Sequence, residues 1–324
     1  MKTILVTGGA GYIGSHAVLA LLESGERVVV LDNLSTDSRE NVPAGAIFVE
    51  GDILDAALVE KTIHAHTVEA LMHFAGLVKV EESVREPERY MRVNVDGTMV
   101  LARAAVEAGV SHFIFSSSAS VYGDAKKNPI AEDAPFAPMC PYAETKMRAE
   151  AELANIVRGS KTHLAILRYF TVAGTDSQGR TGYSFKEKPT HLIRSAVRAL
   201  VRGETFPIFG GDYPTPDGTC IRDFIHVSDL AEAHLAALRA LREGSENCIY
   251  NCGSGTGYSN MEVLKTLQKI ARREMVVHIG ERRAGDPPAL VADISRIKRE
   301  LCWKPTLGLE DMIRDELRWV EKHL

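Results

Sequence analysis

The stretch VTGGAGYIG, at residues 6–14, constrains the fold more than any other feature of the chain. It follows the apolar run KTIL and leads into a helical pattern that begins at Tyr12. Gly8, Gly11 and Gly14 have the spacing at which glycine permits a tight turn, a close approach of backbone to a pyrophosphate, and close packing of a helix on a strand. The first N–H groups of that helix attract phosphate. The sequence therefore predicts a dinucleotide site after the first strand.

Strand and helix patterns alternate through the rest of the first half. The strands we expect are RVVVLD, AIFVEGD, ALMHFAG, HFIFSSS and HLAILRYF, with one long helix at about 87–108. These runs are almost continuously apolar, as in a parallel sheet that helices cover on both faces. We predict an α/β fold: a doubly wound, Rossmann-type parallel sheet at 1–172 and a smaller, mixed α/β C-terminal substrate lobe at 173–324. Segments around 221–253 are expected to return to the main domain.

An acidic residue ends the second apolar run at the expected distance from the glycines. Asp32 in VVVLDN can accept hydrogen bonds from the ribose hydroxyls of an adenosine, and it would repel a 2′-phosphate. The predicted cofactor is therefore NAD rather than NADP. The pair Asp52-Ile53 and the run Phe74-Ala75-Gly76 close the next two strands at the same edge. Each of these two, taken alone, is as readily structural as functional.

Composition excludes several classes of protein. The 324 residues carry a net charge of -5, which argues against a general nucleic-acid binder. The apolar runs are far shorter than the ~20 residues that span a bilayer. The glycines near the N-terminus argue against a signal peptide. Cys248 and Cys252 have no His or Cys cluster nearby, so we predict no metal site and expect the five cysteines to be reduced thiols of a cytoplasmic protein.

The stretch YAETK places a tyrosine and a lysine four residues apart. Tyr142 and Lys146 would share one face of a helix that Pro141 can begin. The pair alone is a weak motif, and a solvated helix face is the alternative interpretation. The fifth strand, however, ends in three serines at 116–118, at the edge where ligands bind in such sheets. A nearby ammonium and a positive nicotinamide ring favour a phenolate, so Tyr142 is predicted to act as a general base on a substrate hydroxyl.

These motifs together resemble the extended short-chain dehydrogenase/reductase superfamily. More closely, the chain resembles the bacterial UDP-glucose 4-epimerase (UDP-galactose 4-epimerase) family over nearly its whole length. The segments that carry the resemblance are VTGGAGYIGSH, LDNLS, VEGDI, HFAGLVKVEESV, FSSSASVYGD, PYAETK, LRYF, IFGGDYPTPDGTCIRDFIHVSDLA and ERRAGD. The segment at 210–230 is highly specific to the family, whereas many proteins share the glycine motif.

The resemblance implies a role for each matching position. Catalysis would fall to Tyr142, Lys146 and Ser118. The residues implied to bind NAD are Gly8, Gly11, Tyr12, Ile13, Gly14, Asp32, Asn33, Asp52, Ile53, Phe74, Ala75, Gly76, Lys79, Asn94, Ser117, Tyr142, Lys146 and Tyr169. Those implied to bind a UDP-sugar are Ser118, Tyr142, Thr171, His191, Leu192, Pro207, Ile208, Phe209, Arg222, Arg283, Asp286 and Leu290. Arg222 and Arg283 would hold the pyrophosphate and Asp286 the ribose.

The implied reaction interconverts UDP-glucose and UDP-galactose. The sugar is oxidised at C4 to a 4-keto intermediate and reduced again on its opposite face with the same tightly bound NAD. A homodimer is implied, with helices around 87–108 and 142–158 at the interface. A UDP-pentose or UDP-uronate 4-epimerase stays an alternative, and so does a non-catalytic NAD-binding sensor. A nucleotide-sugar 4,6-dehydratase is disfavoured, since Ala119-Ser120 stand where it needs an acid/base pair.

Two positions depart from patterns common in this family. Thr171 follows LRYF where many members have asparagine, and it loses the double reach of an amide. Leu290 stands where some bacterial members have tyrosine, at the border of the space for the 2-substituent of the sugar. A side activity on UDP-N-acetylglucosamine is therefore expected.

Overall fold

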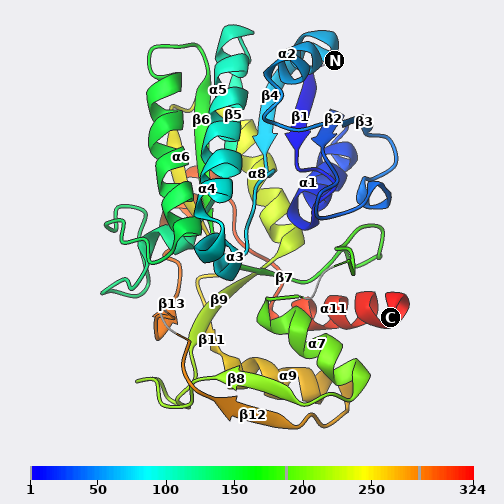
Figure 1. Cartoon of the computed structure of the whole chain (residues 1–324), viewed down its shortest axis with the longest axis vertical. Helices are drawn as coiled ribbons and strands as arrows, with labels where there is room; N and C mark the ends of the chain where they lie inside the picture. The colour runs from blue at the N-terminus through cyan, green and yellow to red at the C-terminus, as the bar shows by residue number, and fades with distance from the viewer. Residues whose placement is uncertain (1, 187–188, 284–285) are drawn as a thin grey trace.

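The computed structural model describes residues 2–186, 189–283 and 286–324. Its main body is a seven-stranded sheet in which every neighbouring pair of strands is parallel (Figure 1). In sheet order the strands are β10 (Cys248–Cys252), β6 (His163–Tyr169), β5 (His112–Ser118), β4 (Val68–His73), β1 (Thr3–Thr7), β2 (Arg27–Asp32) and β3 (Ile47–Glu50). The direction of winding reverses between β1 and β4, which is where doubly wound sheets bind ligands.

Helices cover both faces of this sheet. Successive side chains of a strand point to opposite sides, and here the side chains on both sides are apolar. Ile4 and Val6 join the apolar cluster under α1 (Tyr12–Glu23), α8 (Val227–Arg242) and α10 (Ser295–Leu301). Leu5 joins the other cluster, under α2 (Ala56–His66), α5 (Gly97–Glu107) and α6 (Pro141–Val157). The predicted α/β fold with a doubly wound parallel sheet is therefore confirmed.

The expected long helix at about 87–108 is interrupted. It consists of α4 (Pro87–Met91), a π-helical turn at Arg92–Asp96, and α5, and the short α3 (Val80–Arg85) precedes it. Asn94 lies in the π turn, and its buried amide bonds to the main chain of Leu77 in the loop after β4. A π turn widens the helix locally and often marks a functional site. Here it brings the helix to the edge of the sheet at which ligands bind.

A second lobe follows β6 and lies below the sheet in Figure 1. One of its sheets has β9 (Ile221–His226) paired with β7 (Thr171–Ala173), β11 (Gly257–Ser259) and β13 (Ala289–Leu290), and another pairs β8 (Phe206–Phe209) with β12 (Val277–Gly280). Its apolar core comes chiefly from α7 (Leu192–Arg202), α9 (Asn260–Ala271) and α11 (Leu309–His323). The smaller mixed α/β lobe is thus confirmed. Of the segments around 221–253, α8 and β10 lie with the main sheet, whereas β9 belongs to the second lobe. The exact boundary at residue 172 stays a prediction.

The loop between β7 and α7 ties the second lobe to the first. Arg180 forms an ion pair with Glu23 of α1, and the Thr181 hydroxyl donates to the carbonyl of Asn41, 3.2 Å away. The Ser184 N–H donates to the Asp37 carboxylate at 3.2 Å. This loop therefore packs beside the loop that follows β2, on the adenosine side of the predicted cofactor site. Within the described part of the chain, no helix is long and apolar enough to cross a membrane.

Candidate active site

The glycine turn between β1 and α1 is packed so closely that it excludes side chains. A Cβ at Gly14 would lie 2.1 Å from the Gly8 carbonyl oxygen, and one at Gly8 would lie 2.5 Å from the Ala75 nitrogen. Gly8 also has a φ of 73°, a conformation that favours glycine. No side chain caps the first turn of α1, which begins at Tyr12, and no acidic residue lies in that turn. The turn therefore leaves N–H donors and a positive helix end for an anion.

Acidic and amide side chains lie at the ends of β2 and β3, beside the glycine cradle formed by Gly8, Gly11 and Gly14. The Asp32 carboxylate accepts N–H hydrogen bonds from Ala10 and Leu34, both at 2.9 Å, and burial raises its pKa above the usual value. The Asn33 amide donates to the Asp52 carboxylate at 2.9 Å. Each oxygen of Asp32 keeps a second lone pair for a ribose hydroxyl. These residues fit the adenosine end of NAD.

Two residues assigned to the cofactor site have buried side chains. Ile53 is only 5% exposed, and its side chain belongs to the apolar core, against Gly97 of α5. The Asn94 amide, 2% exposed, donates to the Leu77 carbonyl and the Thr145 hydroxyl and accepts from the Leu77 N–H. Asn94 therefore fixes the loop after β4, and it lies against Gly76. The main chain of Lys79 in that loop is held by the Tyr90 hydroxyl.

Tyr142 and Ser118 meet at the carboxyl end of β5. Tyr142 is in the first turn of α6, after Pro141, and its phenol lies close enough to the Ser118 side chain for that side chain to lower the pKa of the phenol. The pKa of Tyr142 is raised to about 12, because burial disfavours the phenolate more than the nearby Ser118 side chain favours it. The predicted phenolate therefore depends on the positive charges of Lys146 and of the nicotinamide ring together.

Lys146 is held one helical turn further along α6 and is only 6% exposed. Its ammonium donates to the Ser116 carbonyl at 2.9 Å and lies 5.0 Å from the centroid of the Phe115 ring. Burial lowers the pKa of Lys146 to about 8, and the charge of Glu150 partly offsets this. The predicted convergence of Ser118, Tyr142 and Lys146 on one edge of the sheet agrees with this geometry.

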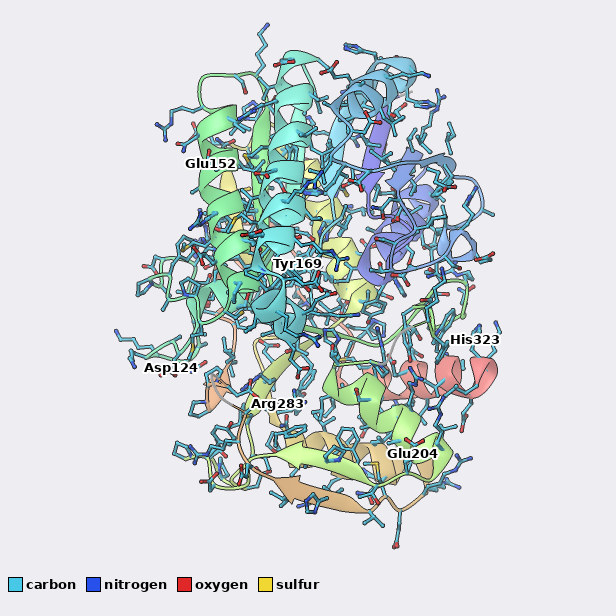
Figure 2. The ribbon with its side chains drawn as sticks, in the orientation of Figure 1. Asp124, Glu152, Tyr169, Glu204, Arg283 and His323 are labelled. Carbon is cyan, nitrogen blue, oxygen red and sulfur yellow. The ribbon has the colours of Figure 1, made fainter. Side chains whose placement is uncertain are left out.

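Sequence reasoning missed two polar residues beneath this edge. The Ser116 hydroxyl donates to the Tyr169 oxygen at 2.9 Å, and the Tyr169 oxygen lies 2.5 Å from Nε2 of His234. Nδ1 of His234 faces the Leu230 carbonyl at 2.8 Å and so carries the proton, which makes Nε2 the acceptor for Tyr169. Figure 2 shows Tyr169 at the end of the sheet that faces the second lobe. The only signal for His234 was a lone histidine on the apolar face of a helix.

Ser117 points to the opposite side of β5 from its neighbours. Its hydroxyl donates to the Glu150 carboxylate, which also forms a buried ion pair with Arg168 at 2.6 Å. Since strand side chains alternate, Ser116 and Ser118 share the other face. The assignment of Ser117 to the cofactor site therefore stays a prediction that only its main chain can meet.

The predicted pyrophosphate residue Arg222 lies on β9 in the second lobe. One of its nitrogens donates to the carbonyls of Ile221 at 2.9 Å and Pro287 at 2.8 Å, and the other lies 3.4 Å from the Asp286 carboxylate. Leu290 on β13 is paired with Arg222 in the sheet register. The structure therefore brings Arg222, Asp286 and Leu290 together, and the guanidinium is oriented before any ligand binds.

Arg283 and β8 lie beside this group. The Arg283 guanidinium carbon is 3.9 Å from the centroid of the Phe209 ring, and its side chain is exposed (Figure 2). Pro207 and Phe209 alternate with Ile208, which is 1% exposed and belongs to the core of the lobe. The side chain of Ile208 therefore supports the site from within, whereas Arg283 and Phe209 are open to a ligand.

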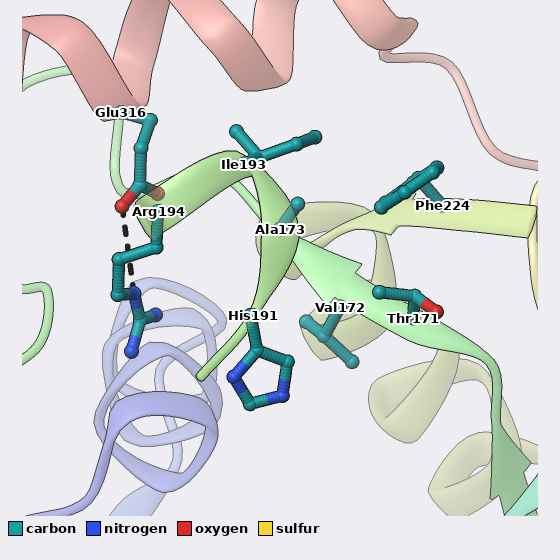
Figure 3. A pocket seen from close by; sticks show the side chains of 8 residues that line it. All are labelled: Thr171, Val172, Ala173, His191, Ile193, Arg194, Phe224 and Glu316. Atoms are coloured by element: carbon teal, nitrogen blue, oxygen red, sulfur yellow. Dashed lines mark ion pairs between the residues drawn. The ribbon is translucent and has the colours of Figure 1, made fainter. Parts of the chain in front are cut away.

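A small cavity in the second lobe is lined by both expected and unexpected residues (Figure 3). Thr171 of β7 and His191, the cap of α7, line it as the substrate assignment expected, and Leu192 is the first residue of α7. Arg194 and Glu316, which the sequence analysis did not single out, face one another there at 3.4 Å. Figure 3 shows the Arg194 side chain extending toward α1.

Known proteins resemble this chain over nearly its whole length. The model of the NAD dependent epimerase/dehydratase family matches residues 4–253. A UDP-glucose 4-epimerase of Azospirillum brasilense is 46% identical, over 98% of this chain and 91% of the relative. The crystal structure of UDP-glucose 4-epimerase from Bifidobacterium longum, in complex with NAD+ and UDP, is 36% identical, covers 99% of each chain and has a TM-score of 0.94.

A third similar protein is named for two sugar nucleotides. It is the UDP-Glc/GlcNAc 4-epimerase from Campylobacter jejuni, 36% identical over 99% of this chain and 100% of that one, with a TM-score of 0.86. Both the family model and these relatives span the glycine cradle, the Ser118–Tyr142 pair and Lys146. The chain belongs to the NAD dependent epimerase/dehydratase family, in the branch that holds the UDP-glucose 4-epimerases.

Proposed function

We propose that this protein is an NAD-dependent UDP-glucose 4-epimerase, which interconverts UDP-glucose and UDP-galactose. The observation that carries the proposal is the proximity of Tyr142 to Ser118, with the Lys146 ammonium one helical turn away, at the sheet edge that the glycine turn also reaches. A base, a hydroxyl partner and a cation at a dinucleotide cradle suit oxidation of an alcohol. Family membership and the relatives' activity support the same reaction.

The residues present fit NAD. The cradle of Gly8, Gly11 and Gly14 would hold the pyrophosphate through the N–H groups of Tyr12 and Ile13. Asp32 would hold the adenosine ribose, with Asn33 and Asp52 beside it. When bound, NAD supplies the acceptor for the C4 hydride and, in its oxidised form, a positive charge near the phenol. Tyr169 and Phe74, which both contact the buried His234 ring, would line the site at the end away from the adenosine.

The proton of the sugar hydroxyl passes to Tyr142. Its phenol has a pKa of about 12 in the protein alone, so it is protonated at neutral pH and needs nearby positive charge to act as a base. Lys146, buried and charged below its pKa of about 8, supplies part of that charge. The Ser118 hydroxyl donates to the phenolate and can also bond the sugar oxygen. The same phenol returns the proton when the keto group is reduced.

The second lobe would hold the UDP part as a fixed handle. Arg222 presents a guanidinium already oriented by two carbonyls and by Asp286, and Arg283 lies exposed on the Phe209 ring. Guanidinium groups suit phosphate oxygens because their N–H donors match the phosphate geometry. A tightly held nucleotide leaves the sugar free to turn and present its other face.

Cofactor content and turnover test this function together. The protein, purified without added cofactor, is expected to release NAD or NADH on denaturation and to show no preference for NADP, because the Asp32 carboxylate repels a 2′-phosphate. It is then expected to convert UDP-galactose to UDP-glucose. Bound NADP with no NAD would overturn the cofactor assignment. Bound NAD without conversion of either sugar nucleotide would instead indicate a binding protein.

The sugar range is expected to depend on Leu290. Leucine lacks the rigid ring of tyrosine, so we expect UDP-glucose and UDP-galactose as the main pair and a measurable rate on UDP-N-acetylglucosamine. Leu290→Tyr adds bulk that typically costs ~1–3 kcal/mol, or about 5- to 150-fold in rate on the N-acetyl sugar. Wild type and variant are assayed on both sugar pairs. Equal loss on both, or no N-acetyl activity in wild type, contradicts this role, and a panel with UDP-xylose and UDP-glucuronate covers the pentose and uronate alternatives.

A homodimer is also part of the proposal, through the helices α4–α5 and α6. These helices pack on one another and lie along one side of the main sheet (Figure 1). Sedimentation of the purified chain tests it, since a monomer at micromolar concentration contradicts it. A cytoplasmic location accords with the five free cysteines and is tested by cell fractionation.

A further inference from the structure

A buried ion pair lies directly behind the reacting residues. Glu150, 4% exposed, is one helical turn beyond Lys146 on α6, and Arg168, 2% exposed, is on β6. Nε of Arg168 donates to one carboxylate oxygen at 3.0 Å and Nη2 donates to the other at 2.6 Å. Burying two charges is costly unless their geometry and remaining hydrogen bonds are satisfied. The pair is therefore expected to hold other residues in position.

The remaining bonds of this pair reach the reacting strand and the loop before α6. The Ser117 hydroxyl donates to the Glu150 carboxylate. Nη1 of Arg168 donates to the Tyr122 hydroxyl at 2.9 Å and to the Glu132 carbonyl at 2.8 Å. Ser117 lies between Ser116, whose hydroxyl bonds to Tyr169, and Ser118, whose side chain lowers the pKa of Tyr142. A displacement of Glu150 therefore moves β5 relative to α6.

We propose that Glu150 is a positioning residue, which braces α6 against β5 and keeps the Lys146 amine in its charged form. This inference rests on the proposed function, in which the Lys146 ammonium favours the Tyr142 phenolate. Among the described residues, the Glu150 carboxylate bonds to Ser117 and Arg168 and not to Tyr142. It acts through Lys146 on its own helix and through Ser117 on the neighbouring strand.

Few other charges surround Lys146 in the described structure. On α6 the titratable groups near it are Tyr142 and Glu150. From β5 it meets the Ser116 carbonyl and the Phe115 ring, and from β4 the neutral, buried His73, whose pKa burial lowers to about 3. Asn94 of the π turn and Lys146 both lie against Gly76, and Arg168 on β6 lies beyond the Glu150 carboxylate. Glu150 is thus the one negative charge among these groups, and it offsets part of the burial that lowers the pKa of Lys146.

The test is the pH dependence of epimerisation in Glu150→Gln. An ammonium is present below its pKa and lost above it, so the alkaline limb of the activity reports the loss of charge from Lys146. Removing the neighbouring carboxylate lowers that pKa, and we expect the limb to move to lower pH by about one unit. Glu152→Gln, which removes an exposed charge two residues further along α6, is the matched control and leaves the limb in place (Figure 2).

A second variant is the control for unfolding, since Glu150→Gln leaves the Arg168 charge buried without its partner. The double variant Glu150→Gln with Arg168→Met removes both charges at similar volume, and its limb is expected to move in the same direction by a smaller amount. A folded single or double variant whose alkaline limb coincides with wild type overturns the proposal.

A direct titration separates this inference from the proposed function. Lysine labelled with ¹³C at Cε is followed by NMR through neutral and alkaline pH, with Lys146→Arg assigning the signal. The Lys146 signal is expected to titrate at lower pH in Glu150→Gln than in wild type, whatever the substrate. An unchanged titration contradicts the proposal even if the epimerase activity is confirmed. A shifted titration in a protein that converts no UDP-sugar leaves the proposal standing and rejects the proposed function.

Discussion

Tyr142→Phe is expected to lower the epimerisation rate by about 10²–10⁴-fold, the usual contribution of a general acid–base residue. The variant keeps the ring that packs beside Ser118 and removes only the hydroxyl that exchanges the proton with the sugar. Binding of UDP is expected to stay near normal, because Arg222 and Asp286 lie in the other lobe. Initial rates with UDP-galactose and calorimetric titration with UDP measure the two quantities.

The control for this variant is Tyr250→Phe, which removes a tyrosine hydroxyl on β10 at the edge of the sheet, away from the reacting group. Its rate is expected to equal that of wild type. Near-normal turnover by Tyr142→Phe would exclude Tyr142 as the base. A loss of UDP binding in step with the rate would instead show that the substitution disturbs the whole site.

Gly14→Ala is expected to abolish NAD retention and, with it, activity. The added Cβ would lie 2.1 Å from the Gly8 carbonyl oxygen and 3.0 Å from the Gly9 Cα, so the main chain of the turn must move. Overpacking of this kind typically costs ~1–3 kcal/mol, and here the displaced atoms are those that form the anion cradle. The measurement is the amount of NAD released per purified chain, together with the thermal midpoint with and without added NAD.

Gly280→Ala is the matched glycine control. Its Cβ would meet only the Ile208 carbonyl oxygen at 3.7 Å, an ordinary contact, and it lies in β12 of the second lobe. Full NAD content is expected in this variant. If Gly14→Ala retained NAD as well as Gly280→Ala does, the glycine turn would not be the pyrophosphate site.

The local pattern of the sequence was enough to determine the main sheet and the edge of that sheet at which the cofactor is predicted to bind. Continuous apolar runs such as RVVVLD and HFIFSSS occur where helices cover both faces, and β2 and β5 have those bounds. The glycine spacing and Asp32 lie within one strand–turn–helix unit, so their geometry depends on neighbours in the chain. The same is true of Tyr142 and Lys146, which a single helix brings together.

Contacts between distant segments were not visible in the sequence. The three adjacent serines cannot be told apart in the sequence. In the structure, side chains alternate along β5, so Ser117 bonds to the buried Glu150–Arg168 ion pair, whereas Ser116 and Ser118 face the site. Ile53 and Ile208 matched family positions, but their side chains are packed in the cores.

The sequence by itself determined the fold class and the cofactor and was enough to propose the reacting residues, because these depend on short-range periodicity and on motifs within single elements. The tertiary structure alone decided which side chains are free to react and in which ionisation state. Burial raises the pKa of Tyr142 to about 12 and lowers that of Lys146 to about 8, and neither shift can be read from YAETK. The physical reason is that desolvation and charge pairing depend on packing between segments far apart in the chain.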